Sequence, residues 1–543
     1  MTMSMALDNP GAVLDPEHAG DIRGAFGTIR LDDTARRRGW SAHLKTLLAI
    51  VGPGLIVMVG DNDAGAFATY GQAGQNYGTR LLWTLLLLVP VLYVNQEMVL
   101  RLGAVTGVGH ARLILERFGK FWGAFSVIDL FLLNSLTIVT EFIGISLAAS
   151  YLGLPKAAAV GLASVVIIGA AFTGSFRRFE RMAMILCGGS LLLIPIYFLS
   201  HPATGQMALG FVTPDLPGGS GQLATVLLLV IGIVGTTVAP WQLFFQQSYV
   251  IDKRITPRFM KYEKADLWIG IVIVVVGAGA VMGFTAAAFA GHAGGFTDAA
   301  GLARGLQAHA GRLAGVLFAI ALLDASIIGA FAVSLSTAYA LGDVFGLKHS
   351  LHRGVKGAKG FYAVYGGLVL AAAAVVLIPG SPLGLLTEGV QALAGVLLPS
   401  ASVYLLLLCN DREVLGPWVN GRRTNIFTTA VVTVLVALSV ILTASVLFPG
   451  ITAAQIVDIL AGFAAGGLVL AGLVTASRLR AGTLAAVPID RAGKESWRMP
   501  PLALLQRPEV PVVRKIGMTT LRLYLAVATI LVVVKIVQLM LAH

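Results

Sequence analysis

The chain has 543 residues, of which 57% are hydrophobic and only 12% charged, and its mean hydropathy is +0.83. Soluble domains carry about 25% charged residues, so this composition excludes a water-soluble globule. The apolar runs extend over roughly 20 residues, which excludes the alternating strands of a β-barrel and predicts an all-α polytopic membrane protein. The two cysteines, Cys187 and Cys409, both lie in apolar runs, which argues against a disulfide framework or a cysteine metal site.

The chain begins with a polar segment, which we interpret as a cytoplasmic N-terminal tail at 1–44 and not as a cleaved signal peptide. About thirteen long apolar segments then predict membrane spans, with twelve as the alternative count. They lie near 47–77, 80–100, 122–152, 156–173, 182–200, 222–250, 266–291, 311–343, 361–379, 385–409, 426–448, 451–476 and 519–541.

The net charge of +12 is distributed very unevenly over the loops. One alternate set of loops, which includes the N-terminal tail, holds 34 of the 39 Lys and Arg residues, and Lys535 lies within the last span. The opposite set holds only Arg80, Lys156, Arg304 and Arg312. The positive-inside rule then predicts a cytoplasmic N-terminus, and thirteen spans would put the C-terminus outside. This distribution also argues against nucleic-acid binding by the basic loops.

Two of the predicted spans are interrupted by glycine, proline and polar residues. The first contains Gly52-Pro53-Gly54 and then Gly60-Asp61-Asn62-Asp63, and the sixth contains Gly235-Thr236-Thr237-Val238-Ala239-Pro240. Broken helices are tolerated in a membrane only where the freed backbone lines a cavity or binds a ligand. Breaks at corresponding positions, five spans apart, predict a transporter built from two inverted repeats, with its site at the membrane midplane.

Acidic residues within or near the spans need an explanation, because a charge in the bilayer is costly. They are Asp61, Asp63, Glu97, Asp129, Glu141, Asp266, Asp324, Asp343, Glu388 and Asp458. Asp63 and Glu141 are the deepest. Asp266 is predicted to be a span-end residue with a solvated or capping role, and Glu97 to be buried with Arg101 at i+4. Asp324 fits either a packed ion pair or a transport pathway.

Three segments resemble the natural resistance-associated macrophage protein (Nramp) family of divalent-metal transporters, over roughly residues 45–420. Gly52-Pro53-Gly54 with Asp63-Ala64-Gly65-Ala66 resembles the family's first-helix motifs. Arg101-Leu102-Gly103 with Val105-Thr106-Gly107 resembles its loop after the second helix. Gln391, Leu398-Pro399 and residues 410–416 resemble its tenth helix and the loop that follows.

The resemblance implies a leucine-transporter-like fold with two inverted repeats of five helices and broken first and sixth helices. It implies a ten-helix transport core at 45–409. Residues 410–543 would then form two or three peripheral helices, with a basic cytoplasmic loop near 477–518. The chain would be a multi-pass protein of a bacterial-type inner membrane and not an enzyme. It would have no cofactor, and its partners would be a divalent cation and the lipid bilayer, with protein partners unknown.

The resemblance also implies a metal site, in which Asp63 stands at the position of the family's aspartate. Ala66 replaces the family's asparagine and Ala239 replaces its methionine. The backbone carbonyl position falls on Thr236, while Thr237 and Gln391 supply a hydroxyl and an amide. Without the thioether, the site loses its preference for soft and borderline transition metals.

A site with one carboxylate and neutral oxygens suits Mg²⁺, which keeps several of its waters. The pattern is similar to the Nramp-related magnesium transporters. Proton-coupled members use a third-helix Asp/Glu pair and a histidine after the sixth-helix proline. Here Glu141 matches the glutamate, Ile138 stands at the aspartate position and Trp241 at the histidine position. We therefore expect uncoupled uptake of Mg²⁺, with Mn²⁺ as a further cargo, driven by the membrane potential.

The sequence leaves four alternatives open. The first is a proton-coupled Mn²⁺/Fe²⁺ importer of the Nramp family. The second is an amino-acid symporter on the same fold, although Asp63 would repel the substrate carboxylate unless it were paired. The third is an inactive paralogue, in which the two alanines reflect degeneration of the site. The fourth is an integral-membrane enzyme or receptor, for which no nucleophile or metal-hydrolase motif is present in a span.

Overall fold

The computed structural model describes residues 12–217, 223–291, 298–379, 383–448, 450–480, 491, 493–506, 518–528, 530 and 534. The N-terminal part contains η1 (Pro16–His18), β1 (Ile22–Arg23), β2 (Thr28–Ile29), α1 (Trp40–Ile50), α2 (Pro53–Asp61) and α3 (Ala64–Tyr77). The chain continues with α4 (Trp83–Thr106), α5 (His110–Phe118), α6 (Lys120–Tyr151), α7 (Lys156–Ala171), α8 (Phe176–Gly189), η2 (Ser190–Leu192), α9 (Leu193–Ser200) and α10 (Thr204–Val212).

The second half repeats this alternation of long and short helices. It contains α11 (Leu223–Thr237), α12 (Pro240–Asp252), η3 (Pro257–Phe259), α13 (Met260–Ala288), α14 (Ala299–Ala310), α15 (Arg312–Phe345), η4 (Val355–Gly357), α16 (Lys359–Leu377) and α17 (Leu383–Leu408). The C-terminal part contains α18 (Arg412–Leu415), η5 (Gly416–Trp418), α19 (Arg422–Leu447), α20 (Ala453–Arg480) and η6 (Leu502–Leu504), and residues 518–528 are also helical.

The predicted apolar segments all coincide with helices in the described part of the chain. Eight helices there are long and apolar enough to cross a membrane, and α1 with α2 makes a ninth if the bent pair is one span. Four shorter apolar helices, Lys156–Ala171, Pro399–Leu408, Ala453–Val469 and Met518–Ala528, fall in the remaining predicted spans. Almost half of the predicted span 519–541 lies outside the described residues, as does much of the predicted loop 477–518.

The first predicted span, 47–77, is interrupted at both predicted places but begins earlier than predicted. It is three helices, and α1 begins at Trp40 and is bent by 56° relative to α2. The bend falls at Gly52, whose φ of +152° is accessible only to glycine, and at Pro53, which begins α2 because it lacks an amide proton. The break predicted near Asp63 is confirmed, since α2 ends at Asp61 and α3 begins at Ala64.

The corresponding break in the second half lies at Val238 and Ala239, between α11 and α12. Pro240 begins α12, and Ala239 before it has the extended backbone (φ −91°, ψ 144°) that a following proline favours. Helix α11 packs against α3, and α12 packs against α2 and α15. The two breaks therefore belong to one packed unit in the interior of the bundle.

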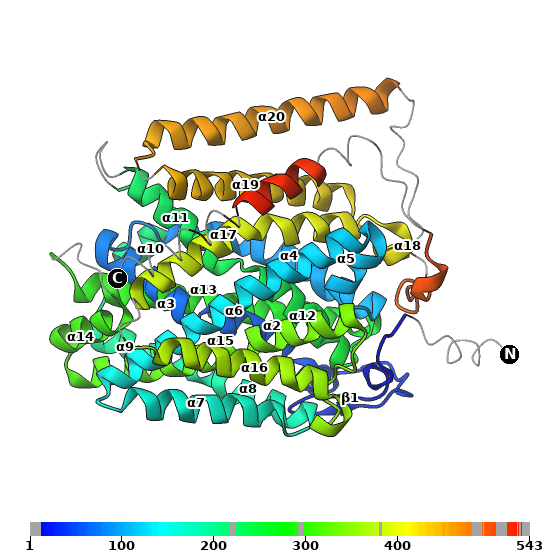
Figure 1. Cartoon of the computed structure of the whole chain (residues 1–543), viewed down its shortest axis with the longest axis horizontal. Helices are drawn as coiled ribbons and strands as arrows, with labels where there is room; N and C mark the ends of the chain where they lie inside the picture. The colour runs from blue at the N-terminus through cyan, green and yellow to red at the C-terminus, as the bar shows by residue number, and fades with distance from the viewer. Residues whose placement is uncertain are drawn as a thin grey trace.

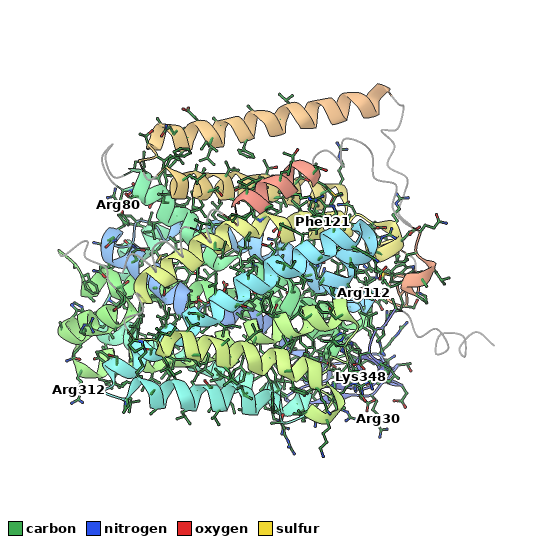
Figure 2. The ribbon with its side chains drawn as sticks, viewed as in Figure 1. Arg30, Arg80, Arg112, Phe121, Arg312 and Lys348 are labelled. Carbon is green, nitrogen blue, oxygen red and sulfur yellow. The ribbon has the colours of Figure 1, made fainter. Side chains whose placement is uncertain are left out.

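Most of the long helices run roughly along the long axis of the molecule (Figure 1). Figure 1 places α20 along one edge, next to α19, and α7 and α8 along the opposite edge. The pairs α15 with α6 and α13 with α2 and α3 form extensive contacts between these edges. Figure 2 shows Arg80 and Arg312 at one end of the helices and Arg30, Arg112 and Lys348 at the other. The labelled members of the two sets of basic residues thus lie at opposite ends.

The polar N-terminal segment is folded against the helix ends that carry the basic loops. A short antiparallel pairing joins β1 and β2. The Arg353 guanidinium donates to Asp15 at 2.6 Å, and Arg254 donates to the backbone of Glu17 at 2.8 Å. The Ala25 amide donates to the buried carboxylate of Glu180 at 2.5 Å. Residues 12–34 are therefore part of the folded molecule.

Asp266 does not have the solvated span-end role that the sequence allowed. It lies on α13 with its residue fully buried, and it accepts hydrogen bonds from the amides of Gly52 (3.1 Å), Gly54 (2.6 Å) and Leu55 (3.3 Å). These amides have no partner within α2, so Asp266 caps the N-terminus of that helix from a distant element. The capping half of the prediction is right, and the solvated half is wrong.

Glu97 is paired with Arg101 as predicted, at 3.2 Å, and it also accepts from Lys264 at 2.9 Å. Cys187 and Cys409 are both buried and unlinked.

A buried ion pair stabilises the bend between α1 and α2. The fully buried Lys253 ammonium donates to Glu180 (2.7 Å) and to the carbonyls of Ile50 (2.6 Å) and Val51 (2.8 Å). Removing one partner of a buried pair leaves an uncompensated charge and costs about 3–5 kcal/mol.

We expect Lys253→Met to lower the thermal stability of the purified protein strongly. The double variant Lys253→Met/Glu180→Leu should recover part of the loss, because it also removes the uncompensated Glu180 charge. Lys264→Met is the matched control, because this side chain is 36% exposed and its pair with Glu97 contributes about 1 kcal/mol or less. Equal melting temperatures for Lys253→Met and Lys264→Met would contradict the assignment.

Candidate metal site

Asp63 lies in the break between α2 and α3 and caps α3. Its backbone is extended, and its carboxylate accepts the amide of Ala66 at 2.9 Å. The residue is only 5% exposed. A helix N-terminus carries partial positive charge and stabilises a carboxylate, which lets an acidic side chain occupy the interior of the bundle.

Glu141, from α6, lies beside Asp63. Its Oε2 accepts the Ala64 amide at 3.3 Å, and its Oε1 is buried with no hydrogen-bond partner among the described residues. Gly329 on α15 permits this approach, since a Cβ there would lie 2.8 Å from Glu141 Oε2 and 3.1 Å from Asp63 Cβ. Two neighbouring buried carboxyl groups need a proton or a cation between them. Gly329 is a site residue that the sequence reasoning missed.

Asp61 belongs to the same break, at the end of α2. Gln242 on α12 donates to its Oδ1, and Gln96 on α4 donates in turn to Gln242 at 2.9 Å. The other oxygen, Oδ2, is buried and has no hydrogen-bond partner among the described residues. The sequence analysis placed Asp61 among the acidic residues within or near the spans but not among the site residues. Its position two residues before Asp63, in the same broken span, could have identified it as part of the site.

The electrostatic character of the centre is set by Asp61, Asp63 and Glu141. In the described part of the chain, none of the three forms an ion pair with Lys, Arg or His. Glu141 therefore lies beside Asp63 and forms no ion pair with a basic residue in the described part of the chain. Burying unpaired carboxylates is costly, so the arrangement favours a cation or protons as the compensating species.

Neutral oxygens lie at the second helix break. Thr236 and Thr237 are buried at the end of α11, and Ala239 is 7% exposed in the break. The Thr237 hydroxyl bonds to the Ile233 carbonyl (2.6 Å) and to the Tyr70 hydroxyl (2.8 Å). Tyr70 of α3 thus ties the two broken helices together and is a further residue that the sequence reasoning missed.

Trp241 and Ala66 are apolar walls of this region. Trp241 is 1% exposed, and its ring lies beside Gly60, where a Cβ would be 3.5 Å from Cη2. Its carbonyl accepts from Ser336 at 3.0 Å. Ala66 is fully buried, and so is Ile138. No polar side chain from these three positions enters the centre.

Two further predicted residues, Gln391 and Asp324, are not shown to be part of this centre. Gln391 is on α17, but its side chain lies outside the described residues. Asp324 on α15 lines a small cavity with Asn62 and forms no ion pair with any described residue. The packed ion pair suggested for Asp324 is therefore not present in this part of the structure.

The donor set is of an unusual kind for a resident metal. Across the described residues, no group of three or more His, Cys, Asp and Glu side chains is arranged to hold a metal ion. Two adjacent carboxyls lie at the first helix break, and backbone carbonyls and hydroxyls lie at the second; ion sites in transporters with broken helices use groups of this kind.

Comparison with solved structures defines the class. The chain is similar to the manganese transporter of Eremococcus coleocola in complex with an aromatic bis-isothiourea compound, with a TM-score of 0.64 and 21% identity over 83% of this chain and 98% of that one. It is also similar to MhsT in complex with L-phenylalanine, with a TM-score of 0.51 and 15% identity over 76% of this chain and all of that one. The protein therefore has the leucine-transporter fold, with two inverted five-helix repeats.

Comparison of sequences identifies the family. The profile described as "Natural resistance-associated macrophage protein-like" matches residues 54–445. The divalent metal cation transporter MntH of Ralstonia nicotianae is 30% identical over 406 residues, which cover 70% of this chain and 87% of the relative. MntH of Burkholderia ambifaria is 31% identical over 332 residues, covering 57% and 71%. The chain belongs to the Nramp family of divalent-metal transporters.

Proposed function

We propose that this protein carries a hydrated, hard divalent cation, with Mg²⁺ as the main cargo and Mn²⁺ as a second one, into the cytoplasm. The observation that carries the proposal is the composition of the centre. Asp63 supplies a carboxylate at the first break, while Ala66 and Ala239 stand where an amide and a thioether would bind a softer metal. Mg²⁺ is typically held by one or two carboxylates and retains waters, which suits such a centre.

The second candidate is a Mn²⁺ or Fe²⁺ importer, and the comparisons taken alone favour it over Mg²⁺. The similar chains are MntH divalent-metal transporters, and the structurally similar protein from Eremococcus coleocola is a manganese transporter. The two candidates differ in what Ala239 means. A soft-metal importer needs another soft ligand in its place, whereas a carrier of a hard ion needs none.

The proposed driving force is the membrane potential, which contributes about 2.3 kcal/mol per charge at 100 mV. A divalent cation therefore gains about 4.6 kcal/mol, enough for roughly a thousandfold accumulation without a coupled proton. Ile138 and Trp241 replace two groups of the proton path that the family resemblance implies. The basic loops and the folded N-terminal segment would face the cytoplasm by the positive-inside rule.

We expect divalent-cation uptake into proteoliposomes to leave the internal pH unchanged. A pH dye and a Mg²⁺ dye are followed together while an inside-negative potential of about 100 mV is imposed. Mg²⁺ should enter with the potential, and a proton gradient without a potential should drive no uptake. Acidification that tracks the metal flux would contradict uncoupled transport. Mn²⁺ flux without Mg²⁺ flux would favour the second candidate.

A further inference from the structure

A second polar centre adjoins the break in the first span. It is a small cavity of about 10 Å³ between α2, η2 and α15, and its polar lining consists of Asn62, Ser190 and Asp324. A volume of this size holds about one water-sized particle. The rest of the lining is apolar.

Asn62 has an unused acceptor at this cavity. The residue is 5% exposed, and its Nδ2 donates to the Val274 carbonyl at 3.2 Å on the side of α13. Its Oδ1 is buried and has no hydrogen-bond partner among the described residues. A buried amide oxygen without a donor costs about 1–3 kcal/mol unless a ligand or water meets it.

Asp324 provides a single negative charge to the same cavity. It forms no ion pair or hydrogen bond with any residue that the structure describes. Its carboxylate lies against the backbone of Gly189, where a Cβ would be 1.9 Å from Oδ2. Glycine at 189 is therefore what allows the carboxylate to reach this position.

Two features of the backbone add to the site. The fifth span changes from α-helix to a 3₁₀ turn at Ser190–Leu192, directly at the cavity, and such a turn within a helix often marks a functional position. Helix α2 ends at Asp61, and Val59 of its last turn lines the cavity. The C-terminal end of a helix carries partial negative charge and favours a cation.

We propose that Asp324, Asn62 and Ser190 form a second cation site, which takes one dehydrated monovalent cation of the size of Na⁺. One carboxylate with neutral oxygens balances a single positive charge. The cavity has no room for the waters that Mg²⁺ retains, so the site is distinct from the divalent centre. The proposal does not depend on which divalent ion is carried.

Occupation of this site would affect the neighbouring centre through the chain itself. Asn62 directly precedes Asp63 in the break between α2 and α3, and Asp324 lies on α15. A cation bound by both residues would therefore link this break to α15. Ions at the two sites would then favour one another's binding, since coupling between sites is reciprocal.

The test uses the purified full-length protein without divalent ions. Its melting temperature and its binding of ²²Na⁺ are measured in NaCl, KCl and N-methyl-D-glucamine chloride at constant ionic strength and pH. We expect Na⁺ to raise the melting temperature by a few °C in a saturable way, as a ligand that binds only the folded state does, with one ion bound per chain. Absence of a sodium effect, or an equal effect of K⁺, would overturn the proposal.

Variants locate the site. Asp324→Asn and Gly189→Ala should each remove the sodium response, the second because the new methyl group displaces the carboxylate. Ser190→Ala should weaken the affinity for ²²Na⁺ several-fold. This variant tests the site if the other two variants do not fold. Asp129→Asn is the matched control, because Asp129 is another buried acid in a span but bonds to Ser400 at 2.8 Å, away from the cavity. Retained sodium binding in Asp324→Asn, or its loss in Asp129→Asn, would contradict the assignment.

Discussion

Replacing Asp63 with alanine or asparagine should reduce divalent-cation uptake in proteoliposomes to the level of protein-free liposomes. The two variants separate the two roles of this side chain. Asparagine caps a helix about as well as aspartate, so Asp63→Asn should keep α3 and the thermal stability of the protein. It removes the charge, however, and with it the carboxylate that binds the ion.

The control for this experiment is Asp129→Asn, which neutralises a buried carboxylate of α6 that bonds to Ser400. It should transport at close to the rate of the unmodified protein. Substantial metal flux in Asp63→Asn, with retained fold, would mean that the cation is held elsewhere. A loss of flux in Asp63→Asn together with a large loss of stability would instead show that the cap is what Asp63 provides.

Installing the missing ligands should move selectivity toward softer metals. In Ala239→Met/Ala66→Asn, a thioether and an amide enter the centre at the two helix breaks, where both alanines are buried. We expect the ratio of Mn²⁺ or Cd²⁺ affinity to Mg²⁺ affinity to rise at least about tenfold, a change of roughly 1.4 kcal/mol, because sulfur favours these ions. Isothermal titration of the purified variants with the three metals measures it.

Ala239→Leu with Ala66→Asn is the matched control, because leucine fills a similar volume without sulfur. It should not raise the affinity for Cd²⁺. An equal rise in both double variants would show that cavity volume and not ligand softness sets the selectivity. No change in either one would mean that position 239 does not face the ion, contrary to the ligand argument.

The helical membrane fold and the break that holds Asp63 were predictable from the sequence, because both depend on local patterns. Hydropathy finds the spans, and an acid among glycines within an apolar run singles out Asp63. The early start of the first helix was missed because residues from Trp40 to Lys45 are polar enough to resemble a tail. Hydropathy carries no signal for such a start.

The partners of the site residues were not predictable, because they join distant parts of the chain. Gln242 bonds to Asp61 across 181 residues, and Lys253 pairs with Glu180 across 73. Gly329 lies against Glu141 and Asp63, but a glycine in a helix rich in alanine and glycine looks like ordinary close packing. The folding of the polar N-terminal segment onto the helix ends also depends on such long-range contacts, among them Arg353 with Asp15.

One assay tests the choice between Mg²⁺ and Mn²⁺ most directly. Uptake of Mg²⁺ and of Mn²⁺ is measured separately in proteoliposomes under an inside-negative potential, and then in competition. The composition of the site around Asp63, Ala66 and Ala239 predicts Mg²⁺ flux that Mn²⁺ inhibits only at similar concentrations. Mn²⁺ flux without Mg²⁺ flux, or inhibition by Mn²⁺ at concentrations a hundredfold below Mg²⁺, would contradict this account.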